Sequence, residues 1–89
     1  MNSYSKIVNP NINLLIRDHT NLVKKISWHL HGRVNSIIEI EDIIQIGMLG
    51  LISAAQNYIP QKDASFASYA SIRVKGEILD FLRKSSNLD

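Results

Sequence analysis

The chain has 89 residues, of which 45% are hydrophobic, and a net charge of +2. This length suits one compact domain with a single core and is too short for two domains. The absence of cysteine excludes a disulfide framework and a thiolate metal site. The apolar runs are too short to span a membrane, and the N-terminus has no continuous apolar segment for secretion. We therefore expect a soluble intracellular protein of the reducing cytoplasm.

The charge is unevenly distributed along the chain. Residues 1–37 include five basic residues and one acidic residue, whereas residues 38–61 include three acidic residues and no basic one. Residues 62–84 are again basic, with five basic residues against three acidic ones. The middle segment is therefore chemically unlike its two neighbours.

Apolar residues recur at helical spacing in three segments, and no alternating pattern typical of strands competes with them. The first segment covers residues 11–31, either as one helix or, with a break near His19 and Thr20, as two, and it is expected to end at Gly32. The second covers residues 39–58, with acidic residues at its start and a proline after its end. The third covers residues 66–84, with Ser65 as the N-cap. This pattern predicts an all-α fold, a compact bundle of three to four helices.

The second helix is apolar on two opposite sides. A helical wheel gives a broad core face of Ile40, Ile43, Ile44, Gly47, Gly50, Leu51, Ala54, Ala55 and Tyr58. Each glycine costs roughly 1 kcal/mol relative to alanine in a helix interior, and we attribute both to the close approach of another helix. The opposite arc holds Asp42, Gln45, Ile46, Met48, Leu49 and Ile52. This arc either binds a partner or is covered by the N-terminal helix as a second core.

The third helix also has two distinct sides. Its core arc consists of Ala67, Ala70, Val74, Ile78, Phe81 and Leu82. The other arc mixes apolar, aromatic and basic residues: Phe66, Tyr69, Ile72, Arg73, Gly76, Leu79 and Arg83, with Lys75 at its margin. Such a surface suits unstacked bases and phosphates, but mixtures of this kind also occur on solvated helices, so periodicity alone leaves both interpretations open.

The sequence contains no constellation typical of catalysis or metal binding. His29 and His31 are two residues apart on a helix, which directs their rings away from each other, and no carboxylate lies suitably near them or His19. We find no glycine-rich phosphate loop and no nucleophile paired with a base. We therefore expect a protein that is not an enzyme and that has no cofactor.

The segment EDIIQIGMLGLISAAQNYIPQKDASFASYASIRVKGEILDFLRK resembles the second conserved region of bacterial RNA polymerase sigma factors. The first motif of that family is matched by Asp42, Ile43, Ile44, Gln45, Gly47, Gly50 and Leu51. The second is matched by Phe66, Ser68, Tyr69 and Ala70. LVKKISWHLHGRV and IRVKGEILDFLR resemble the flagellar and motility subgroup. The resemblance implies an N-terminal extension over 1–13, a region 2 domain over 14–84 and the start of a linker over 85–89.

The resemblance also implies partners and site residues. The second helix of the family binds the coiled-coil of the polymerase β′ subunit, which assigns polymerase binding to Asp42, Gln45, Ile46, Met48 and Ile52. The following helix binds the nontemplate strand of the promoter minus-ten element and keeps the DNA melted. That function falls on Phe66, Tyr69, Ile72, Arg73, Lys75 and Gly76. The resemblance further implies transcription initiation at flagellar or motility genes, and an anti-sigma protein is a further expected partner.

Two departures from the family pattern shape this hypothesis. Ile72 and Arg73 stand where housekeeping sigma factors have a tryptophan pair at the edge of the melted DNA, so Arg73 is expected to contact a base edge or a phosphate. No counterpart of the domain that binds the minus-thirty-five element precedes Asp89, which suggests a piece of a longer protein or a shortened relative. The alternative function is a module that binds polymerase or an anti-sigma protein without productive DNA binding. Promoter binding requires Tyr69 and Arg73 to be exposed on a continuous basic surface.

Overall fold

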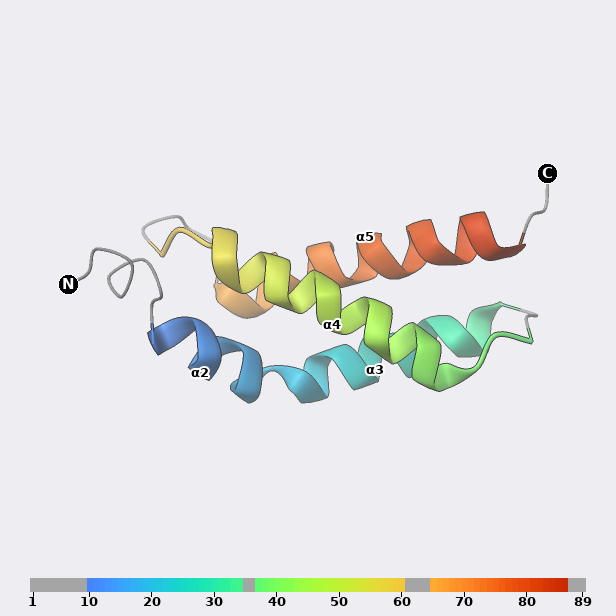
Figure 1. Ribbon diagram of the computed structural model, residues 1–89, viewed down its shortest axis with the longest axis horizontal. Helices are drawn as coiled ribbons and strands as arrows, with labels where there is room; N and C mark the ends of the chain where they lie inside the picture. The colour runs from blue at the N-terminus through green and yellow to red at the C-terminus, as the bar shows by residue number, and fades with distance from the viewer. Residues whose placement is uncertain (1–9, 35–36, 61–64, 87–89) are drawn as a thin grey trace.

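The computed structural model describes residues 10–34, 37–60 and 65–86, and these form four helices and no strand. The helices are α2 (Pro10–Asp18), α3 (Thr20–Arg33), α4 (Ile40–Asn57) and α5 (Phe66–Ser86), arranged lengthwise against one another (Figure 1). The predicted all-α fold is confirmed. None of the described helices is long and apolar enough to cross a membrane.

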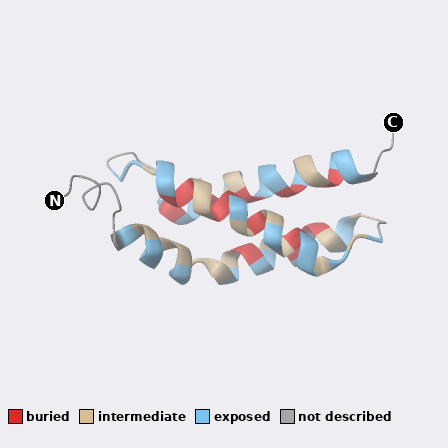
Figure 2. Cartoon of the chain, viewed as in Figure 1, coloured by how far each residue is buried: buried red, intermediate tan, exposed pale blue. Residues whose placement is uncertain are grey.

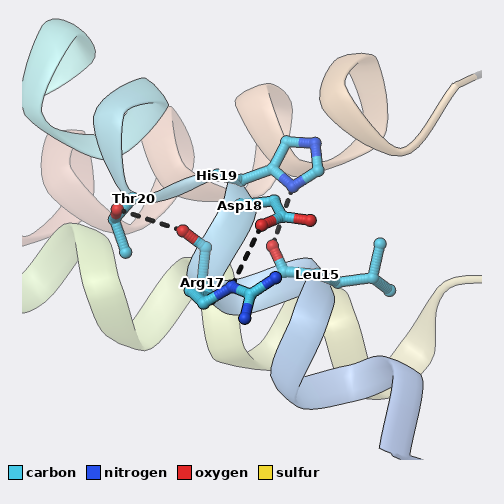
Figure 3. A network of polar contacts seen from close by, with 5 residues as sticks. All are labelled: Leu15, Arg17, Asp18, His19 and Thr20. Atoms are coloured by element: carbon cyan, nitrogen blue, oxygen red, sulfur yellow. Dashed lines mark hydrogen bonds and ion pairs between the residues drawn. The ribbon is translucent and has the colours of Figure 1, made fainter.

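The first predicted helix is divided at His19 into α2 and α3 (Figure 3). Side chains bond two backbone carbonyls at this junction: His19 Nδ1 donates to the carbonyl of Leu15 at 2.7 Å, and Thr20 Oγ1 donates to that of Arg17 at 3.3 Å. Polar residues that bond nearby backbone groups in this way offer the chain an alternative to a continuous helix. The junction therefore has a local cause in the sequence.

The predicted end of α3 at Gly32 is wrong by one residue. The helix continues to Arg33, and Val34 then takes an extended conformation with φ −114° and ψ 142°. The chain therefore leaves the helix through an ordinary extended residue and does not use the conformational freedom of a glycine. The predicted N-cap of α5 is confirmed, because the Ser68 amide donates to Ser65 Oγ at 3.2 Å.

The core lies where α3, α4 and α5 face one another, as the buried positions in Figure 2 show. Helix α4 makes its most extensive contacts with α5 and also packs on α3, while α2 contributes only partly buried residues. The residues that α4 buries belong to its predicted core face: Ile43, Gly47, Gly50, Leu51, Ala54 and Ala55. The predicted core face of α4 is thus correct at its centre.

The two glycines of α4 lie at close contacts between helices. A Cβ added at Gly50 would lie 3.0 Å from the backbone oxygen of Arg73 and 3.0 Å from the Cα of Val74. A Cβ added at Gly47 would lie 2.8 Å from Val23 Cγ1 and 3.1 Å from Ile78 Cδ1. Gly50 therefore faces the backbone of α5, whereas Gly47 faces side chains of α3 and α5. Close packing, as predicted, accounts for both.

Ser27 provides a test of the core because its hydroxyl is fully buried and has no hydrogen-bond partner among the described residues. An unsatisfied buried hydroxyl costs about 1–3 kcal/mol. We expect Ser27→Ala to raise the free energy of unfolding by about 1 kcal/mol, because alanine removes that polar atom with little change of volume. Urea denaturation followed by circular dichroism measures this gain, and a lower unfolding midpoint would contradict it.

Candidate functional site

The outer strip of α4, defined as Asp42, Gln45, Ile46, Met48, Leu49 and Ile52, remains accessible in the folded chain. Asp42 and Gln45 are exposed, and the side chains of Ile46, Met48 and Ile52 are half-buried. Leu49 is 58% exposed although it is a large apolar residue in the middle of a helix. Helix α2 meets the C-terminal part of α4, where both helices line a groove that includes Leu15, Ala55 and Tyr58. The outer strip is therefore not closed into a second core.

The outer face of α5, defined as Ser71, Ile72, Lys75, Gly76 and Leu79, surrounds a shallow hollow of about 230 Å³. Ile72 is 72% exposed, and Lys75 and Gly76 are exposed beside it. A Cβ added at Gly76 would meet no atom within 4 Å. In contrast to Gly47 and Gly50, Gly76 leaves open space on the surface.

The placement of Phe66 on the exposed arc of α5 is wrong. Phe66 is only 7% exposed and its ring packs edge-on against His19 and Tyr58, with centroids 4.7 and 5.2 Å apart. Tyr58 also contacts the ring of Tyr69 at 5.5 Å. These four residues form an aromatic cluster that joins the α2 and α3 junction to the end of α4 and the start of α5. The neighbouring Ala67, expected in the core, is exposed instead, because the positions that this end of α5 buries are Phe66 and Ala70.

Tyr69 and Arg73 meet the required exposure only in part, since both are half-buried. Arg73 Nη2 donates to Ser53 Oγ of α4 at 2.6 Å, and Arg73 Nη1 donates to Tyr69 Oη at 3.3 Å. The guanidinium carbon also lies 5.9 Å from the centroid of the Tyr69 ring. We call these three residues the polar bridge. Arg73 is thus bound to its own chain, while Ile72 and Lys75 beside it are exposed.

His19 and His31 make structural contacts. His19 bonds to the carbonyl of Leu15, and His31 Nε2 donates to the carbonyl of Ile38 at 3.1 Å. Over residues 10–34, 37–60 and 65–86, no group of three His, Cys, Asp or Glu side chains is arranged to hold a metal ion.

Sequence patterns alone did not identify two features of the site. The polar bridge depends on Ser53 and Arg73, which are 20 residues apart, and no local spacing relates them. Trp28 of α3 is the second feature, since it is 57% exposed and its ring lies 6.0 Å from that of His31. The lysines that precede Trp28 on its helix were the available signal that this side faces solvent.

The small bundle leaves two helix faces accessible. The outer strip of α4 is apolar with acidic and amide groups, whereas the outer face of α5 is apolar with a lysine. The family model for Sigma-70 region 2 matches residues 15–87, so the chain belongs to the sigma-70 family through this region.

Relatives with known names agree with this assignment. The chain is 47% identical over 70 residues to RNA polymerase sigma factor FliA of Pseudomonas aeruginosa, covering 79% of this chain and 28% of the relative. It is 38% identical over 72 residues to the RNA polymerase sigma factor for flagellar operon of Vibrio parahaemolyticus, covering 81% of this chain and 30% of the relative. The match therefore spans less than a third of the length of either relative, and the similarity to the flagellar type expected from the sequence is confirmed.

Proposed function

We propose that this domain binds RNA polymerase through the outer strip of α4 and the promoter minus-ten element through α5. The domain acts as part of a sigma factor that starts transcription of flagellar or motility genes in the bacterial cytoplasm. The polymerase partner is the coiled-coil of the β′ subunit, and the DNA partner is the nontemplate strand. Residues 14–84 carry both activities. The observation that carries the proposal is the outer strip itself, which stays accessible after all four helices have packed.

The chemistry of the outer strip suits a protein partner. An exposed apolar residue at the centre, Leu49, is surrounded by half-buried apolar residues and by the exposed polar groups of Asp42 and Gln45. Protein interfaces commonly combine an apolar centre that is desolvated on binding with a polar rim. Ile46, Met48 and Ile52 supply the sides of such a centre, and Asp42 and Gln45 supply hydrogen-bonding groups at its margin.

The chemistry of α5 suits a single DNA strand. Ile72 offers an apolar surface, Gly76 leaves room for close approach, and Lys75 provides a cation for a phosphate. Tyr69 lies on the same helix and offers an aromatic ring. Phe66 does not face the strand itself, because its ring is buried in the aromatic cluster, where it packs against Tyr58.

The outer strip predicts a specific loss of polymerase binding. We expect Leu49→Ala and Gln45→Ala each to weaken binding to the isolated β′ coiled-coil by about tenfold, since truncating a central interface residue typically costs more than 1 kcal/mol. Fluorescence anisotropy of a labelled coiled-coil measures the dissociation constants. Lys25→Ala serves as the control, because Lys25 is exposed on α3. Equal binding by all three variants and the original chain would reject the outer strip as the docking surface.

The bonding of Arg73 to Ser53 favours a second candidate function, in which the domain binds polymerase or an anti-sigma protein without productive DNA binding. The two functions are separated by selection from a library of randomised forked DNA, using the chain bound to core polymerase. Enrichment of a defined minus-ten sequence supports promoter binding. Retention of the complex on polymerase with no enriched sequence supports the second function.

A further inference from the structure

Arg73 lies between two helices that the proposed function assigns to different partners. It extends from α5 to Ser53 on α4, and it also reaches the phenol oxygen of Tyr69 one turn earlier on its own helix. The bond to Ser53 is short at 2.6 Å. The guanidinium is therefore held at two points by its own chain.

The chemistry of the guanidinium fixes the direction of both bonds. Arginine has only donors, so Ser53 Oγ and Tyr69 Oη must each act as acceptors toward it. Its planar fork carries donors on two nitrogens at a fixed separation, which one lysine ammonium cannot reproduce. Because the phenol oxygen of Tyr69 accepts from Arg73, its own proton is left to donate to another group.

The aromatic cluster restrains the same tyrosine from the other side. The ring of Tyr58 lies 5.5 Å from that of Tyr69 and is tilted by 45° relative to it. Tyr58 in turn packs edge-on against the buried Phe66. Tyr69 is therefore held between an aromatic neighbour at the end of α4 and the guanidinium of Arg73.

The surroundings of Arg73 differ from those of a free phosphate-binding residue. Arg73 is half-buried, whereas Lys75, two residues later, is exposed. No ion pair joins Arg73 to a carboxylate anywhere in the described parts of the chain. The guanidinium carbon lies 5.9 Å from the centroid of the Tyr69 ring.

We propose that Arg73 is a positioning residue that orients Tyr69 toward the DNA strand, and that Ser53 holds Arg73 in place for this purpose. This inference rests on the proposed promoter-binding function and assigns a part in it to Ser53. Arg73 makes neither a base contact nor a phosphate contact. The Tyr69 ring meets a base, and the phenol proton points to an acceptor of the strand.

The test measures binding of a forked DNA, carrying the sequence enriched from the library, to the chain in complex with core polymerase. We expect Ser53→Ala, Arg73→Ala and Arg73→Lys each to weaken binding by about tenfold. Ser53→Ala removes the bond that holds Arg73 in place, and the two Arg73 variants remove the fork that spans Ser53 and Tyr69. The affinity of the double variant Ser53→Ala with Arg73→Lys is expected to lie within about twofold of that of either single variant, since the residues act as one unit. Ser53→Thr retains the hydroxyl and should restore binding.

The salt dependence distinguishes positioning from a phosphate contact. Loss of one contact to a single strand lowers the slope of log affinity against log salt by about 0.7. We expect Lys75→Ala to lower this slope by about that amount and Arg73→Ala to leave it unchanged. All variants are measured below the onset of their thermal unfolding, which is followed by circular dichroism, and their binding to the β′ coiled-coil is measured in parallel.

Two results would overturn the assignment while leaving the proposed function in place. These are wild-type affinity for Arg73→Lys, and a slope for Arg73→Ala that falls as it does for Lys75→Ala. Wild-type affinity for Ser53→Ala would remove Ser53 from the mechanism and reject the polar bridge. Failure of the unaltered complex to bind any forked DNA would instead overturn the promoter-binding function, and this inference with it.

Discussion

Gly50→Ala is expected to destabilise the domain by about 2 kcal/mol, a large fraction of the stability of so small a fold. Alanine is the better helix former by roughly 1 kcal/mol, so propensity alone predicts the opposite sign. The added Cβ, however, would lie 3.0 Å from the Arg73 oxygen and the Val74 Cα. These are backbone atoms in the middle of α5, and they cannot move aside without separating the two helices. Chemical denaturation measures the loss.

Gly76→Ala is the matched control for this experiment. It makes the same change in a helix interior, but the new Cβ would meet no atom within 4 Å. We expect it to raise the free energy of unfolding by up to about 1 kcal/mol. If the two variants shift the unfolding midpoint in the same direction, close contact between α4 and α5 is not the reason for Gly50.

Phe66→Ala is expected to lower the free energy of unfolding by about 3–5 kcal/mol, because it empties a buried position. Phe66 is 7% exposed and contacts the rings of His19 and Tyr58, so its removal loosens α2, α4 and α5 together. The loss should appear in the absence of DNA and polymerase. Thermal and urea denaturation of the isolated chain measure it directly.

Phe66→Leu serves as the comparison, since it keeps most of the apolar volume at this position. Hydrophobic substitutions that conserve volume usually cost less than about 1.5 kcal/mol. A Phe66→Ala chain as stable as the original would show that the ring does not support the core, and would return Phe66 to the set of residues available for DNA contact.

The periodicity of the sequence predicts most of the fold. The bounds of α4 and the start of α5 follow from residues with a local physical effect, such as the acids at the start of α4 and the Ser65 hydroxyl. The core face of α4 follows from its apolar spacing, and its centre at Leu51 and Ala54 is fully buried. These features depend on neighbours within a few residues, which a helical wheel represents well.

The errors concern helix ends and contacts between distant residues. A helical wheel assigned Phe66 to the exposed arc because it considers α5 alone. Tyr58 and His19, which bury Phe66, come from other segments of the chain. The wheel also gives no sign that Arg73 bonds to Ser53, because Ser53 belongs to a different helix. The division of the outer arcs into exposed and half-buried residues depends on how the helices cross, which local spacing does not encode.

Gly76 carries a conformational penalty within α5 that no contact in the described structure offsets. At Gly47 and Gly50 the missing side chain is matched by an atom of a neighbouring helix, so the folded chain itself explains the choice of residue. At Gly76 a substitution to alanine would strengthen the helix and disturb nothing nearby. Folding alone therefore gives no reason to keep glycine there. Under the proposed function, close approach of the DNA strand to this open surface supplies such a reason.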